Sequence, residues 1–218
     1  MNLTAEEWKR IWLEIGERIE EKKDELCDLD RVIGDGDHGI SMAIGWQAIR
    51  DDLLRMEKEK DLGALLRSVS RTFLNAVGAS VGPLYGTAFL RGSAVLAGKE
   101  AASAEDAQRF WIAAVGGIQQ MGKAQIGDKT MLDTWIPIAE SLGASLEAGE
   151  AWETALDKAA EAGRRGMEST RDLVSRIGRS GRLGERSKGH IDPGAASAFV
   201  IFSAFVDGCK RRKGATSQ

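Results

Sequence analysis

Apolar residues recur at intervals of three and four along most of this chain, which is the period of an α-helix with one buried face. The first run comprises Trp8, Ile11, Trp12, Ile15 and Ile19. Similar runs predict further helices near 62–77, 103–118, 131–147, 150–175 and 194–212. No segment alternates convincingly between apolar and polar residues, as a half-buried strand would. The pattern therefore predicts an all-α bundle.

Two of these helices carry a start signal. Thr4 is followed three residues later by Glu7, and Ser103 is followed three residues later by Asp106. In a capping box the first side chain accepts a hydrogen bond from the amide three residues on, and the later side chain accepts one in return. We expect helices to begin directly after Thr4 and Ser103.

Composition and charge exclude several classes of protein. A chain of 218 residues that is 43% hydrophobic suits one domain over 1–218, and we expect a frayed basic tail at 210–218. The net charge of −3 gives no reason to expect a nucleic-acid partner, and no apolar run approaches the roughly 20 residues of a membrane span. Cys27 and Cys209 match no metal or disulfide spacing, and the acidic N-terminus shows no signal peptide. These features favour a cytoplasmic protein without a membrane partner.

The stretch DRVIGDGDHG at 30–39 places Asp30, Asp35 and Asp37 close together among glycines. Neighbouring carboxylates repel one another unless a cation lies between them, and Mg²⁺ is commonly held by a few carboxylates plus phosphate oxygens. The residues after this stretch look helical, so their first amides would point at an anion beside the metal. This combination predicts a nucleotide phosphate site. An acidic turn with Asp37 as a helix cap is the alternative that remains open.

Two other functions for this stretch fail. The spacing of Gly34, Gly36 and Gly39 formally matches the dinucleotide fingerprint, but a charged segment precedes it where that fingerprint needs a buried strand. An EF-hand loop counted from Asp35 would place Trp46 where the bidentate glutamate belongs.

Three further loops are candidates for the same site. The stretch GASVGPLYGTAF at 78–89 offers small residues and the Ser80 hydroxyl, and a tight turn between helices explains it equally well. The stretch GDKTMLDTW at 127–135 has Lys129 near a helix start, where a solvated helix cap is the alternative. The basic stretch at 178–197 is long enough to be a lid over phosphates, and a merely mobile loop is the alternative.

Taken together, the four loops resemble the L subunit of dihydroxyacetone kinases, the DhaL family. The matching stretches are LDRVIGDGDHG, GPLYGTAF, GDKTMLDTW and LGERSKGHIDPGA. They occur in the family's order, and the similarity covers nearly the whole chain. The resemblance implies a barrel of eight antiparallel helices, with ADP or ATP bound among the loops at one end.

The resemblance also assigns roles to residues. It implies two Mg²⁺ ions held by Asp30, Asp35 and Asp37, with Arg179 as a further catalytic residue. The nucleotide contacts that it implies are His38, Gly39, Ile40, Ser41, Ser80, Val81, Gly122, Met131, Arg179, Asp192, Pro193 and Gly194. The chain departs from the family pattern in the second loop, where Ala79 replaces a glycine and Val81 replaces a serine. Ser41 stands where asparagine is frequent.

By this resemblance, the chain is a phosphotransferase subunit that passes the γ-phosphate of Mg-bound ATP to dihydroxyacetone on a separate K subunit. The donor is either exchanging ATP or resident ADP recharged by a phosphohistidine protein of the sugar phosphotransferase system. The rival functions are a kinase subunit for another short ketose or a fatty acid, and a nucleotide-bound regulatory docking module. The sequence leaves a homodimer open.

Overall fold

The computed structural model describes residues 2–78 and 80–215, with side chains to residue 211. Within these residues it contains nine α-helices, two short 3-10 helices and two short strands. The elements are β1 Asn2–Thr4, α1 Ala5–Glu21, α2 Lys23–Ile33, α3 His38–Arg55, α4 Leu62–Ala76, α5 Val81–Val95, β2 Ala101–Ser103, α6 Ala104–Gly122, α7 Leu132–Glu147, α8 Trp152–Ser169, η1 Thr170–Asp172, η2 Ser180–Ser187 and α9 Pro193–Ala215.

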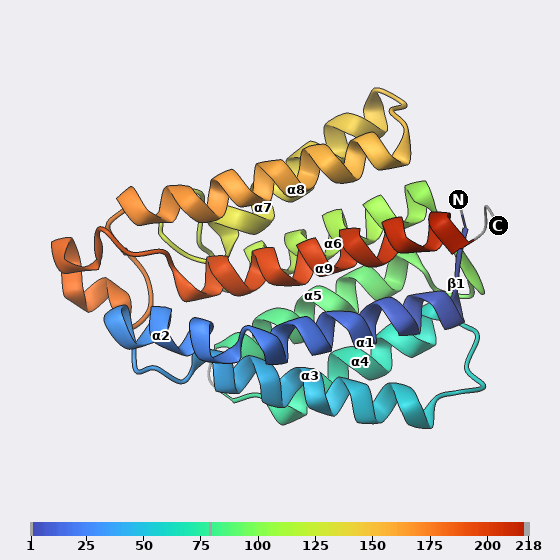
Figure 1. Ribbon diagram of the computed structural model, residues 1–218, viewed down its shortest axis with the longest axis horizontal. Helices are drawn as coiled ribbons and strands as arrows, with labels where there is room; N and C mark the ends of the chain where they lie inside the picture. The colour runs from blue at the N-terminus through green and yellow to red at the C-terminus, as the bar shows by residue number, and fades with distance from the viewer. Residues whose placement is uncertain (1, 79, 216–218) are drawn as a thin grey trace.

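Eight of the helices form a closed ring. α1 contacts α3, and the ring continues through α4, α5, α6, α7 and α8 to α9, which contacts α1 again. Neighbours in the ring run in opposite directions, and α2 lies outside it as an extension beyond the end of α1 (Figure 1). The all-α antiparallel barrel predicted from the sequence is therefore confirmed, with one helix more than expected.

Alternation of direction sorts the helix ends into two groups. α3, α5, α7 and α9 begin at the end of the barrel that carries α2, whereas α1, α4, α6 and α8 begin at the far end beside both chain termini (Figure 1). The first group of N-termini includes the four loops that sequence analysis singled out. The topology thus brings segments distant in the sequence to one end of the molecule.

Aromatic side chains fill the middle of the ring. Trp12 of α1 packs edge-on against Phe89 of α5, with ring centroids 4.8 Å apart, and Trp111 of α6 stacks on Trp135 of α7 at 5.2 Å. All four side chains are almost fully buried. Burial of each large apolar side chain contributes roughly 1.5–3 kcal/mol to stability, so this core holds the barrel rigid between its two ends.

Both predicted capping boxes are confirmed. The Thr4 hydroxyl accepts a hydrogen bond from the Glu7 amide, and the Glu7 carboxylate accepts one from the Thr4 amide at 2.7 Å. Ser103 and Asp106 form the same reciprocal pair at the start of α6. The two signals therefore start α1 and α6 where the sequence indicated.

Four features differ from the sequence expectations. Strands β1 and β2 pair antiparallel, and three-residue strands are too short to show an alternating pattern. The helix expected over 150–175 ends at Ser169, and the stretch at 178–197 holds η2 and the start of α9.

The helix α9 continues to Ala215 through the first part of the expected frayed tail; residues 216–218 lie outside the described chain. Lys210 and Arg211 form ion pairs with Asp157 of α8 and Glu14 of α1.

None of the helices in the described residues combines the length and the apolar composition that a bilayer crossing requires.

Close packing of α3 on α4 predicts the effect of a single methyl group. A Cβ atom at Gly45 would lie 2.3 Å from Phe73 Cε2 and 2.6 Å from Val77 Cγ2. We expect Gly45→Ala to lower the free energy of unfolding by about 1–3 kcal/mol through overpacking. Gly116 on the exposed face of α6 has open space around it, so Gly116→Ala should instead raise stability by about 0.5–1 kcal/mol. Urea unfolding of both variants checks this, and equal effects of the two would contradict the packing argument.

Candidate functional site

The α2–α3 loop is folded around one carboxylate. Asp30, in the last turn of α2, is almost buried, and its Oδ2 accepts backbone amides from Gly36 at 2.9 Å, Asp37 at 3.0 Å and His38 at 3.2 Å. A Cβ atom at Gly34 would lie 2.0 Å from Asp30 Oδ1, so glycine is required there. Asp30 therefore fixes the loop, and the glycines allow the chain to come this close.

The same loop brings three carboxylates together. One oxygen from each of Asp30, Asp35 and Asp37 lies within 4.8 Å of the other two. Asp35 and Asp37 are exposed and face a common pocket with Asp30. Carboxylate oxygens at this spacing suit a hard divalent cation such as Mg²⁺, so the residues present fit the metal that the sequence predicts.

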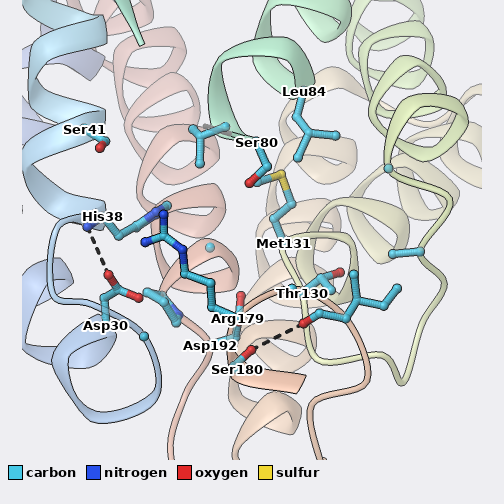
Figure 2. Close-up of a pocket in the computed structure, with 18 of the residues that line it drawn as sticks. Asp30, His38, Ser41, Ser80, Leu84, Thr130, Met131, Arg179, Ser180 and Asp192 are labelled. Carbon is cyan, nitrogen blue, oxygen red and sulfur yellow. Dashed lines mark hydrogen bonds between the residues drawn. The ribbon is translucent and has the colours of Figure 1, made fainter. Parts of the chain in front are cut away.

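A pocket of about 720 Å³ opens beside these carboxylates, at the end of the barrel where α3, α5, α7 and α9 begin (Figure 2). Most of the residues predicted from the sequence line it: Asp30, Asp35, Asp37, His38, Ser41, Ser80, Val81, Gly122, Met131, Arg179, Asp192, Pro193 and Gly194. Four segments that are far apart in the sequence thus share one pocket. The volume lies within the roughly 300–1,000 Å³ of small-molecule sites.

Gly39 and Ile40 are predicted nucleotide contacts that do not line the pocket. A Cβ atom at Gly39 would lie 2.0 Å from the Lys23 carbonyl oxygen, so this residue packs against α2. The Ile40 side chain is 49% exposed and does not line the pocket. Any contact that these two residues make with a ligand has to come from their backbone amides.

The helix N-termini at the two ends of the barrel differ in side-chain capping. At the far end, side chains of Thr4, Asp61 and Ser103 cap α1, α4 and α6, although α8 has no such cap. At the pocket, among the described residues, neither α3 nor α5 has a side-chain cap from its N-cap residue. Uncapped helix N-termini present free amides and the positive end of the helix dipole.

The free amides can be identified residue by residue. In the described chain, the amides of Gly39 and Ile40 in α3, and of Val81 and Gly82 in α5, have no hydrogen-bond acceptor. The two remaining helices at this end are satisfied, since Leu132 donates to the Thr130 hydroxyl and Ala195 donates to the Asp192 carboxylate. α3 and α5 therefore form the part of the pocket that is open to an anion.

The second loop carries the departures from the family pattern. Ser80 is exposed at the pocket, its side chain makes no capping bond, and Val81 is the first residue of α5. Figure 2 draws Ser80 beside Met131. The Ser80 hydroxyl is thus available to a ligand in place of the missing serine at 81. Ala79 lies outside the described residues.

The other side of the pocket is apolar. Its wall comes from the first turn of α5, the last turn of α6 and the start of α7. The residues concerned are Pro83, Leu84, Ile118, Met121, Gly122, Ala124, Met131 and Leu132. Sequence analysis missed most of them because residues such as Ile118 fall on helical stripes that also read as core. This slot suits a flat ring system beside the charged half of the pocket.

Arg179 covers the charged half from a segment between η1 and α9. Its guanidinium forms an ion pair with Asp35, and both side chains remain largely exposed. Arg179 is labelled in the middle of the pocket, between Asp30 and Met131, in Figure 2. A positive charge at this position can bind either a carboxylate of the acidic loop or an anionic ligand lying beside it.

Burial shifts the pKa values of His38 and Asp192, which line the pocket. It lowers the pKa of His38 to about 4, so that the imidazole is neutral at pH 7, and its Nε2 lies 2.8 Å from the Ser197 hydroxyl. Burial raises the pKa of Asp192 to about 7, partly offset by the Ala195 amide and the charge of Lys129. Perturbed groups of this kind gather at functional sites.

The chain is similar to a known family and to several known proteins. The family described as "DAK2 domain" matches residues 32–207. The chain is 39% identical to the "PEP-dependent dihydroxyacetone kinase 1, ADP-binding subunit DhaL" of Listeria innocua serovar 6a, over 92% of this chain and 95% of that protein. It is 36% identical to the "PTS-dependent dihydroxyacetone kinase, ADP-binding subunit DhaL" of Lactococcus lactis, over 90% and 94% of the two chains. The resemblance predicted from the sequence is confirmed.

A solved structure has the same fold. The dihydroxyacetone kinase of C. freundii, crystallised with AMP-PNP and Mg²⁺, superimposes with a TM-score of 0.69 at 24% identity. The match covers 91% of this chain and 33% of that longer chain. At this identity the likeness establishes the fold.

The carboxylate cluster predicts a divalent-cation site that one substitution disables. Asp35→Ala removes a ligand without touching the amides that Asp30 holds, so the loop should keep its shape. We expect Mn²⁺ affinity to fall about a hundredfold or more, because residues that only orient metal ligands already account for about 10- to 100-fold. Electron paramagnetic resonance of bound Mn²⁺ measures this. Asp28→Ala, on the exposed face of α2, is the control, and equal affinities of the two variants would refute the cluster as a metal site.

The raised pKa of Asp192 predicts a pH dependence of stability. Between about pH 4 and about pH 7 the folded state holds a proton on Asp192 that the unfolded chain has already released. The contribution of Asp192 to the free energy of unfolding should therefore decrease as pH rises through this window, and level off above it. Urea unfolding from pH 4 to 8 checks this. The difference between the wild type and Asp192→Asn isolates the effect, and a difference independent of pH would contradict it.

Proposed function

The chain belongs to the DAK2 domain family, and from this we propose that it is the nucleotide-binding subunit of a dihydroxyacetone kinase. It would pass the γ-phosphate of Mg-bound ATP to dihydroxyacetone held by a separate K subunit. One observation carries the proposal. A carboxylate cluster fit for Mg²⁺ and two uncapped helix N-termini meet in a single pocket that also has an apolar slot. Divalent cations and free amides together recognise nucleotide phosphates.

Different residues of the pocket contact different parts of the nucleotide. The apolar slot between Leu84 and Met131 takes the adenine, while the amides of Gly39 and Val81 and the Ser80 hydroxyl face the phosphates. Asp30, Asp35 and Asp37 hold Mg²⁺, two ions in our proposal. When bound, the metal neutralises phosphate charge and aligns the phosphate oxygens. The Ser197 hydroxyl donates to the Gly194 carbonyl, so the neutral His38 donates its one ring hydrogen, on Nε2, to Ser197 and adds no charge beside the phosphates.

Arg179 acts at the transferred group. Phosphoryl transfer depends on positioning and on stabilising the charge of the oxygen atoms, and a guanidinium beside the acidic loop suits that role. Its ion pair with Asp35 keeps it within reach of the metal loop. The proposed catalytic set is therefore Asp30, Asp35, Asp37 and Arg179.

The partner and the donor follow from the relatives. Their names describe subunits that are PEP-dependent or PTS-dependent, which favours ADP as a resident cofactor recharged by a phosphohistidine protein of the phosphotransferase system. In that scheme the acceptor sits on the K subunit, which has to reach the mouth of the pocket. Free exchange of ATP is the alternative donor scheme. Another short ketose remains the alternative acceptor.

The test is to denature the protein purified in Mg²⁺ and quantify the released nucleotide and metal. About one ADP and two Mg²⁺ per chain would support a resident cofactor. An empty site that binds ATP reversibly would support the exchange scheme. A site that binds neither ADP nor ATP in Mg²⁺ would refute the proposed function.

A second experiment separates transfer from binding. With a dihydroxyacetone-loaded K subunit, we expect Arg179→Gln to lower the rate of phosphoryl transfer about 10²- to 10³-fold while ADP stays bound, because a single charge-stabilising donor contributes about this much. Arg182→Gln is the matched control. It lies in the same segment, is exposed and does not line the pocket. Equal rates for the two variants would remove Arg179 from the mechanism.

A further inference from the structure

Lys129 is a buried lysine that the proposed function does not use. Only 1% of it is exposed, and its backbone has a φ of +61°, a left-handed conformation that is uncommon for any residue with a side chain. Strained residues of this kind persist where the surroundings fix them, often at functional sites. The solvated helix cap, which the sequence left open as the alternative for this loop, is therefore wrong for Lys129.

The surrounding loop holds Lys129 in this conformation. Asp133, in the first turn of α7, accepts hydrogen bonds from the Gly127 amide at 2.6 Å and from the Thr130 amide at 2.8 Å. These bonds connect residues 127 and 130 to the start of α7, and Lys129 lies between the two bonded residues in the sequence. The side chain is thereby directed inward, and burial lowers its pKa.

The ammonium group of Lys129 donates to two backbone carbonyls, those of Thr170 and His190. These residues flank the segment 171–189, called the lid below, which carries Arg179 and also Ser180 of the pocket wall. A hydrogen bond of 2.7 Å from the Gly189 amide to the Arg171 carbonyl closes the base of the lid. One side chain from a different loop thus bonds to both ends of the lid.

The same loop also forms part of the nucleotide pocket. Met131, two residues after Lys129, lines the apolar slot, and the Asp128 carbonyl accepts the Arg176 amide of the lid at 3.2 Å. The wall proposed to contact adenine and the lid proposed to cover phosphate are therefore joined through 128–131.

We propose that Lys129 is a positioning residue that fastens both ends of the lid, and so sets the residence time of bound nucleotide and the placement of Arg179. This inference rests on the proposed nucleotide site. It goes beyond that site in assigning control of the lid to Lys129, which lines the pocket and whose ammonium group bonds to the Thr170 and His190 carbonyls.

A second buried lysine provides a matched control. Lys9 of α1 is 6% exposed and also donates to two backbone carbonyls, those of Met56 at 2.6 Å and Glu57 at 3.0 Å. These carbonyls end α3 at the far end of the barrel. Lys9→Met therefore removes the same kind of interaction, with the same change in side chain, away from the lid.

Two measurements on the full chain test the proposal. The first is the rate at which trypsin cuts the lid at its exposed basic residues, mapped by mass spectrometry: Arg171, Arg176, Arg179, Arg182, Arg186 and Lys188. The second is the dissociation rate of a fluorescent ADP analogue in Mg²⁺. In Lys129→Met both rates should rise about tenfold or more, since each hydrogen bond from a charged donor contributes enough for roughly a tenfold change in an equilibrium. In Lys9→Met both rates should stay within about twofold of wild type, even if Lys9→Met lowers the melting temperature as much as Lys129→Met does.

The outcomes are distinct. The proposal is overturned if Lys129→Met and Lys9→Met have equal rates of lid cleavage and of nucleotide release. Lys129 would then have only a general structural role. If Lys129→Met does not fold, Lys129→Asn removes the ammonium and retains a residue that tolerates the left-handed backbone. If the wild type binds no nucleotide, the proposed function fails, while lid cleavage still decides whether Lys129 fastens the lid.

Discussion

The antiparallel order of the closed ring is the constraint on which the site depends. Because each helix runs opposite to its neighbours, every second helix begins at the same end, and the positive ends of α3, α5, α7 and α9 converge there (Figure 1). The aromatic core between the two ends keeps those N-termini at fixed separations. Reversing one of these four helices would move its N-terminus to the far end of the barrel, away from the pocket. The location of the pocket is thus a consequence of topology before any individual side chain is considered.

The chain then leaves part of that end unsatisfied. A missing N-cap costs about 1 kcal/mol, and capping side chains are present at three helices of the far end. The uncapped starts of α3 and α5 are therefore a local cost that a bound anion would offset. The acidic loop makes the same kind of compromise, since clustered carboxylates destabilise one another until a cation binds. Both features imply that ligand binding stabilises the pocket end.

Local signals in the sequence predicted the helices, and the resemblance to the DhaL family implied the barrel. The stripe on residues 8–19 and the pair Thr4 and Glu7 lie within a few turns of one helix, so they could be read directly. The pairing of β1 with β2 could not be predicted, because three residues are too few to show a strand pattern and each strand is defined only by its hydrogen bonds to the other. The acidic loop was also readable, since its three carboxylates lie within eight positions of the sequence.

The contacts of Lys129 could not be predicted from the sequence. A lysine between Asp128 and Thr130 looks like part of a solvated turn, and its partners are carbonyls at positions 170 and 190 that carry no sequence signal. The apolar slot was missed for a related reason, because Ile118 has the spacing of a core residue and only the three-dimensional structure shows that it also faces a pocket. Contacts between residues that are far apart in the sequence therefore require the structure.

In the proposed function, the free amides of α3 and α5, together with the acidic loop, bind a nucleotide through Mg²⁺. The most direct measurement is hydrogen exchange of the backbone amides with and without Mg-ADP. We expect new protection to be concentrated at Gly39, Ile40, Val81 and Gly82, with no change at the capped starts of α1, α4 and α6. Protection spread evenly over both ends of the barrel, or no protection at these four amides, would contradict it.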